Sequence, residues 1–251
     1  MIEAILAAIQ IEGQWLLIFG AMLAGLVRGF SGFGSAMIFL PIAAQVVTPI
    51  WAILILIGME LIGPLPLVRS AFRDARKRDL LLLLGSAACL LPVGLSLLSR
   101  ITPETYRYIV STISLVLLTG LIFGWSYKGK MYPPLLAGIG ALAGFSGGLG
   151  GVPGPPVILF YMASALPVKT VRANMFLFLF CIEFLLVGVV ALRGELELTP
   201  VILGLLMAIP YGIGNLVGAA IFDPDRAGVY RTFAYIIIAA AAIIGLPFWT
   251  E

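Results

Sequence analysis

Charged residues are scarce in this chain. Only 11% of its 251 residues are Asp, Glu, Lys or Arg, against about 25% in an ordinary soluble domain. Hydrophobic residues make up 61%, and the mean hydropathy is +1.13. This composition excludes a soluble globular fold and predicts an all-α polytopic membrane protein in the lipid bilayer. The net charge of +3 comes from basic residues grouped in loops between apolar segments, so we do not expect nucleic acid as a partner.

Histidine is absent, and cysteine occurs only twice. The first absence removes the commonest metal ligand and general base. Cys89 and Cys181 stand far apart inside apolar segments, which indicates small buried side chains rather than a disulfide or a metal pair. An enzyme needs a nucleophile with its base, or a metal cluster. We therefore expect no enzyme, no metal site and no cofactor, and keep an intramembrane enzyme only as a remote alternative.

Glycine, by contrast, is abundant and forms part of a motif that occurs twice. Gly-Phe-Ser-Gly stands at residues 29–32 and again at 144–147, each time inside an apolar stretch. Glycine lets the backbone turn where other residues resist. A backbone opened inside a bilayer is tolerated only where it is buried in protein or lines a cavity. Two such interruptions at corresponding points of two halves indicate the binding site of a transporter.

Ten apolar segments divide the chain into two sets of five. They lie at 14–30, 35–48, 50–68, 80–98 and 105–125, and then at 133–145, 151–165, 170–192, 200–222 and 228–248. About 20 helical residues span a hydrocarbon core of ~30 Å, so the third to fifth segments of each set can cross alone. The first two segments of each set are short and flank the motif. They form either two tight spans or a re-entrant hairpin, and we slightly favour the hairpin.

Three pairs of markers in the same order indicate that the two sets are one repeat. The pairs are Pro41 with Pro156, Pro92-Val93-Gly94 with Pro210-Tyr211-Gly212, and Tyr106-Arg107 with Tyr230-Arg231. We place the first repeat at residues 1–127 and the second at residues 128–251, within one integral membrane unit.

Loop charge then orients the two repeats. Residues 69–79 carry a net charge of +3, whereas the equivalent residues 193–199 carry −1. Because positively charged loops stay in the cytoplasm, the two loops are expected on opposite sides of the membrane. The predicted fold is therefore two inverted-topology repeats, each with a glycine-rich broken or re-entrant helix pair followed by three spanning helices.

The motifs suggest a site for an anion. A helix that begins inside the membrane directs N–H groups and the positive end of its dipole into the cavity, and such groups bind oxyanions. The segments after Gly34 and Gly151 begin in this way, and serine hydroxyls would add donors. The predicted substrate cradle consists of Ser31, Gly32, Phe33, Gly34, Ser146, Gly147, Gly148 and Gly150. The alternative is that the glycines only let helices pack closely.

Four polar side chains inside apolar segments extend this prediction. Glu60 and Glu183 occupy roughly corresponding places on the third segments, where a charged group is costly and is a functional candidate by default. Either can carry a coupling proton, or can tie helices together as a neutral carboxyl. Arg28 can face the anion or extend along its span to the cytoplasmic surface. Asn174 can line the cavity or link two helices by a hydrogen bond.

The two glycine motifs, in halves that each continue through a Pro-x-Gly segment to a Tyr-Arg start, resemble the TauE/SafE family of sulfite exporters. This family is also called the toluene sulfonate uptake permease family. The resemblance covers nearly the whole chain and implies a multi-pass transporter of the bacterial inner membrane. Its substrates would be sulfur-containing oxyanions: sulfite, thiosulfate or an organosulfonate such as sulfoacetate. The two motifs differ where Phe33 stands opposite Gly148, which makes the half-sites unequal.

We therefore expect a secondary transporter that moves a small sulfur-containing oxyanion by alternating access, coupled to protons. The alternative is a transporter or channel for another small organic anion, a carboxylate or a phosphonate. A channel is disfavoured because the spans carry almost no charge from which to build a selective ring. The sequence leaves open the direction of transport and the oligomeric state, for which a homodimer is one option.

Overall fold

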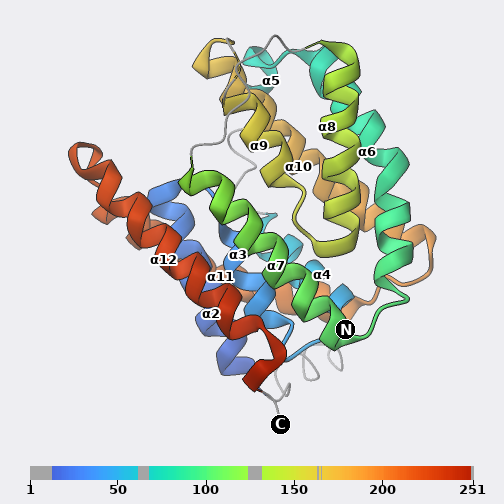
Figure 1. Cartoon of the computed structure of the whole chain (residues 1–251), viewed down its shortest axis with the longest axis vertical. Coiled ribbons are helices and arrows are strands. Elements are labelled where there is room, and N and C mark those ends of the chain that lie inside the picture. The colour runs from blue at the N-terminus through green and yellow to red at the C-terminus, as the bar shows by residue number, and fades with distance from the viewer. Residues whose placement is uncertain (1–12, 62–67, 124–131, 163, 165, 250–251) are drawn as a thin grey trace. The chain divides into compact units, whose positions relative to one another are not determined.

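The computed structural model describes residues 13–61, 68–123, 132–162, 164 and 166–249 of the chain. Over these residues it contains eleven α-helices, two short 3-10 helices and no strand (Figure 1). The helices of the first half are α2 (Gln14–Ser31), α3 (Ser35–Ala43), α4 (Pro49–Glu60), α5 (Val68–Asp74), α6 (Lys77–Leu98) and α7 (Pro103–Ile122). Those of the second half are α8 (Pro133–Gly150), α9 (Gly154–Met162), α10 (Val168–Leu192), α11 (Leu198–Ile221) and α12 (Ala227–Gly245), with the 3-10 helices at Pro224–Arg226 and Pro247–Trp249.

Six of these helices are long and apolar enough to cross a membrane. They are α2, α6, α7, α10, α11 and α12. The prediction of an all-α chain with several membrane-spanning helices is therefore confirmed. The second helix of each set, α3 or α9, has only nine residues and packs against the 18-residue helix before it.

Helix α4 is shorter than the span predicted at residues 50–68. It has twelve residues and ends at Glu60, which makes it about 18 Å long, well short of a ~30 Å hydrocarbon core. It is accordingly not among the helices able to cross alone, and Glu60 lies at the end of a helix rather than inside one. The predicted span extended beyond the end of α4 because the apolar run in the sequence continues to Val68. Residues 62–67 lie outside the described residues.

The second glycine motif remains helical further than the sequence predicted. The expected segment ends at residue 145, whereas α8 continues to Gly150. A glycine inside a helix costs about 1 kcal/mol relative to alanine, and here close packing on α6 offsets that cost. A Cβ atom at Gly144 would overlap the backbone of Ala87, and one at Gly148 would overlap that of Leu91. Gly144 and Gly148 therefore let α8 pack closely against α6.

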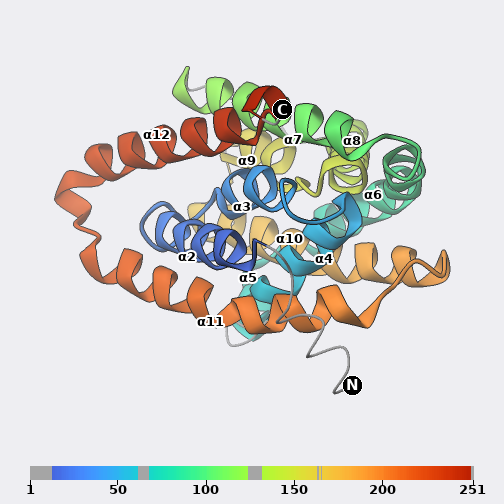
Figure 2. The same cartoon turned by 90° about the horizontal axis from the view of Figure 1, so that it is seen from below.

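The chain forms two compact units, and each contains helices from both halves. The first unit comprises residues 1–62, 101–122 and 197–251. In it, α2 and α4 both pack against α11 (Figure 2). Added Cβ atoms at Gly25 and Gly29 of α2 would overlap backbone atoms of α11. Small residues therefore bring these two helices into close contact, as in many membrane proteins.

Helix α12 packs against α7 and α3 in the same unit. Buried Arg107, at the start of α7, donates hydrogen bonds to the carbonyl oxygens of Gly245 (3.0 Å, from Nε) and Leu246 (3.3 Å, from Nη2). A cation at a helix C-terminus satisfies the last carbonyls and complements the helix dipole. The Tyr-Arg marker of the first half therefore ties α7 to the end of α12.

The second unit comprises residues 63–100 and 123–196. In it, α8 packs along α6, and α10 packs against α5, α6 and α9. The helix pairing follows the same rule in both units: the first helix of one half packs against the fourth segment of the other half. In the first unit the pair is α2 and α11, and in the second it is α8 and α6. The two compact units thus divide the chain differently from the two predicted repeats, residues 1–127 and 128–251.

Candidate functional site

The first glycine motif ends α2 and starts α3. Helix α2 stops at Ser31, and Gly32 and Gly34 then adopt left-handed φ angles of 80° and 94°, which glycine tolerates best. The Ser31 hydroxyl lies 2.7 Å from the carbonyl oxygen of Val27 and 2.8 Å from that of Phe33, and accepts the Phe33 N–H at 3.3 Å. Helix α3 begins directly after Gly34, as the sequence predicted. The serine hydroxyl therefore closes the break between the two helices.

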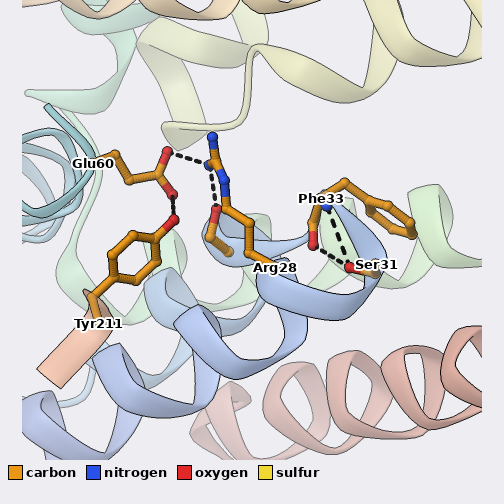
Figure 3. Close-up of polar contacts among 6 residues, drawn as sticks. Arg28, Ser31, Phe33, Glu60 and Tyr211 are labelled. Atoms are coloured by element: carbon orange, nitrogen blue, oxygen red, sulfur yellow. Dashed lines mark hydrogen bonds and ion pairs between the residues drawn. The ribbon is translucent and has the colours of Figure 1, made fainter. Parts of the chain in front are cut away.

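One turn before this break, Arg28 forms a partly buried ion pair. Its Nη1 atom lies 2.7 Å from Oε2 of Glu60 and donates to the hydroxyl of Ser35, the first residue of α3, at 3.1 Å (Figure 3). The Tyr211 hydroxyl of α11 donates to the other carboxylate oxygen, Oε1, at 3.3 Å. Glu60 is only 8% exposed. Residues from α2, α3, α4 and α11 are thus joined in one polar network.

The network gathers all the titratable side chains of its four helices. Helices α2, α3, α4 and α11 carry Arg28, Glu60 and Tyr211 and no other titratable residue. A buried charge costs several kcal/mol unless it is paired, and this pair is neutral as a whole. The guanidinium also lies at the N-terminus of α3, where the helix dipole is positive. The Arg28 guanidinium, the positive N-terminus of α3 and the Glu60 carboxylate therefore lie together at the helix break in the first half.

The second motif is built differently. Helix α8 ends at Gly150 and is capped by Gly151, whose φ angle is 69°. Helix α9 begins at Gly154, so the predicted start of a helix after Gly151 is confirmed. The Ser146 hydroxyl donates toward the carbonyl oxygens of Ala143 (3.3 Å) and Val152 (3.1 Å). Pro155 and Pro156 occupy the first turn of α9, where their missing N–H groups cost nothing. This half of the predicted cradle therefore offers fewer backbone donors than the first.

A family model described as the sulfite exporter TauE/SafE matches residues 17–244. The chain belongs to this family. Searches of curated proteins and of solved structures found no match. The TauE/SafE family is a transporter family, and its match agrees with six helices long enough to span a membrane. The chain is therefore a multi-pass membrane protein of a family that transports sulfur-containing anions.

In this TauE/SafE protein Asn174 holds the start of a helix. It is fully buried; its Oδ1 atom accepts the backbone N–H of Arg76 at 2.8 Å, and its Nδ2 donates to the hydroxyl of Tyr161 at 3.0 Å. Arg76 immediately precedes α6. Glu183 lies half-buried within α10. A substrate contact of Asn174 and a coupling role of Glu183 stay predictions.

The predicted cradle is divided between the two compact units. Residues 31–34 belong to the first unit, together with Arg28 and Glu60, whereas residues 146–150 belong to the second, together with Asn174 and Glu183. Within the first unit the structure brings Arg28 and Glu60 into contact and leaves Ser31 and Phe33 in the neighbouring helix break (Figure 3). The substrate contacts of all the cradle residues stay predictions.

Two members of the network were not singled out in the sequence. Tyr211 served only as the middle of the Pro210-Tyr211-Gly212 repeat marker, and Ser35 only as the residue after the first motif. A signal for Tyr211 was present, because it is the one titratable side chain in a 24-residue apolar helix. Ser35 stands at the first position of a helix, where small hydroxyl residues are common, so its type alone carries little information.

Proposed function

We propose that this TauE/SafE family member is a secondary transporter of the bacterial inner membrane that moves a small sulfur-containing oxyanion. The substrate would be sulfite, thiosulfate or an organosulfonate such as sulfoacetate, moved by alternating access and coupled to protons. The single observation that carries the proposal is the partly buried network in which Arg28 reaches the first residue of α3. It supplies a cation and a helix N-terminus at a break in a membrane helix, and both attract anions.

The head group of a sulfonate or sulfite fits the chemistry of this network. A guanidinium presents N–H donors in a fixed fork that matches oxyanions, and charge-assisted hydrogen bonds are stronger than neutral ones. The start of α3 adds backbone N–H groups and the Ser35 hydroxyl. Substrate recognition by Arg28 and Ser35 therefore needs no metal and no cofactor.

Alternating access is supported by the internal repetition of the chain. Each half has a break between an 18-residue and a nine-residue helix, at residues 32–34 in the first half and 151–153 in the second. In each unit the first helix of one half packs on the fourth segment of the other half. The opposite loop charges support an inverted relation between the halves. Broken helices at matching places in inverted repeats are typical of secondary transporters.

The inverted topology predicts the side from which two loop positions can be labelled. With Cys89 and Cys181 replaced, a single cysteine at Ala75 is expected to react with an impermeant thiol reagent only from the cytoplasm. One at Leu196 is expected to react only from outside. The reason is the net charge of +3 in the first loop and −1 in the second. Labelling of intact cells and of inverted vesicles measures this, and reaction of both positions from one side would contradict the inverted repeat.

The substrate class predicts which anions stabilise the purified protein. Sulfite, thiosulfate and sulfoacetate are to be compared with matched carboxylates and phosphonates by thermal unfolding in detergent. A ligand at about 100 times its Kd adds about 2.7 kcal/mol, or roughly 5–10 °C for a chain of this size. Stabilisation by carboxylates or phosphonates without any by sulfur oxyanions would show that the substrate class is wrong.

A further inference from the structure

The carboxylate of Glu60 occupies the donor groups that an oxyanion substrate would use. We propose that Glu60 competes with the substrate for Arg28. Its carboxylate binds Arg28 until a substrate anion replaces the carboxylate, and protonation of Glu60 breaks the ion pair and makes Arg28 available to the anion. This inference rests on the proposed function and adds a mechanism for coupling. It assigns Arg28 to the anion and Glu60 to the proton, and it gives Tyr211 the role of a positioning residue.

The geometry of the carboxylate supports the competition. One of its oxygens accepts from Arg28 at 2.7 Å and the other from the Tyr211 hydroxyl at 3.3 Å (Figure 3). The same Nη1 atom of Arg28 also donates to Ser35 at 3.1 Å. The carboxylate therefore lies on the guanidinium at the start of α3, where the dipole favours any anion. Because carboxylates and sulfur oxyanions both bind through charged oxygens, they compete for these donors.

The charges around Glu60 explain why anion and proton would bind together. Helix α4 packs against α11 and α3, and Arg28 reaches it from α2. Across these elements the groups that face Glu60 are the cation Arg28 and the neutral hydroxyl Tyr211, because α3 has no titratable side chain. A proton from solvent that forms an O–H bond on the carboxylate would leave the Arg28 charge without its counter-ion. An arriving monovalent anion then restores neutrality, so one proton accompanies one such anion.

Tyr211 fixes where the carboxylate lies. Its hydroxyl holds Oε1 while Arg28 holds Oε2, so the carboxylate is bound at both oxygens. Tyr211 belongs to α11, which carries the Pro-x-Gly segment of the second half. Loss of the hydroxyl should loosen the carboxylate and favour its exchange for an anion, without removing the site of protonation.

The test is anion binding by the full chain in detergent, measured as Kd against pH. The probes are thiosulfate and methanesulfonate, because their charge does not change between about pH 5.5 and pH 8. The wild-type affinity is expected to rise as pH falls, by at most about tenfold per pH unit for one linked proton. Glu60→Gln should bind at pH 8 at least about tenfold more tightly than wild type, and its affinity should not vary with pH. Glu104→Gln, an exposed carboxylate on α7 of the same unit, is the matched control and should behave as wild type.

Each outcome decides the matter. Equal or weaker binding by Glu60→Gln than by wild type at pH 8, in a protein that still binds a probe, would overturn the competition and leave the transporter function standing. No binding of any sulfur oxyanion to either protein at any pH would overturn the function and the inference with it. If Glu60→Gln does not fold, Tyr211→Phe replaces it. That variant is expected to bind roughly three- to tenfold more tightly at pH 8, the effect of one hydrogen bond, and weaker binding would overturn the inference.

Discussion

Replacement of Arg28 by alanine is expected to abolish anion transport and to destabilise the protein by about 3–5 kcal/mol. The destabilisation follows because the variant leaves the Glu60 charge buried without its counter-ion. The loss of transport follows because each hydrogen bond to a charged group contributes about 1.5–3 kcal/mol, which corresponds to roughly a 10- to 100-fold loss of affinity. Thermal unfolding and uptake of labelled thiosulfate into proteoliposomes measure the two effects.

A double variant separates the two effects of Arg28. Arg28→Ala with Glu60→Gln removes the buried charge together with its partner, so much of the stability should return. Transport should stay lost, because the anion still lacks its cation. Arg28→Lys is the milder comparison, since it keeps the charge and loses the planar fork. Wild-type transport by the double variant would show that Arg28 does not bind the anion.

Replacement of Gly144 by alanine is expected to cost about 3 kcal/mol or more of stability. Overpacking usually costs about 1–3 kcal/mol, and here the added Cβ meets the backbone of Ala87, which cannot move aside as a side chain can. The control is Gly138→Ala on the same helix, where no atom lies within 4 Å of the added Cβ. That change should be neutral or stabilise by up to about 1 kcal/mol, because alanine is the better helix former.

Thermal unfolding of the two glycine variants in detergent measures the difference. The midpoint of Gly144→Ala should lie roughly 6–12 °C below that of wild type, and that of Gly138→Ala at or above it. The same comparison is available on α11, where Gly214 lies against the backbone of Met22 and Gly212 faces open space. Equal midpoints for Gly144→Ala and Gly138→Ala would show that the backbone contact with α6 does not hold the helices together.

The sequence predicted a helix boundary where the backbone conformation requires glycine. The starts of α3 and α9 follow Gly34 and Gly151, whose left-handed φ angles leave few other choices. The end of α4 was missed because the sequence stays apolar beyond Glu60, although Gly63-Pro64 follows as a helix-stop signal. The helical path of α8 through its glycines was also hidden, since it depends on contacts with α6 that local propensity does not include.

The members of the polar network were easier to find than their contacts. Arg28 and Glu60 stood out because charge is rare in apolar segments. Their pairing joins residues 32 positions apart, and the Tyr211 bond to Glu60 spans 151 positions. Such contacts depend on which helices pack together, and the spacing of residues within one helix does not predict that packing. The contact of Tyr211 with Glu60 could be found only once α11 was known to lie against α2 and α4.

The exchange of first helices between the halves sets an order for biosynthesis. Helix α2 leaves the ribosome early, but its partner α11 begins only at Leu198. At about 5–20 residues per second, that gap lasts roughly 10–30 s. During this time the glycine face of α2 has no α11 to pack on, whereas α6 gains its partner α8 once residue 150 has been made. The second unit can therefore assemble during translation before α11 is made, and the first unit, with its ion pair, forms only after α11 has been made.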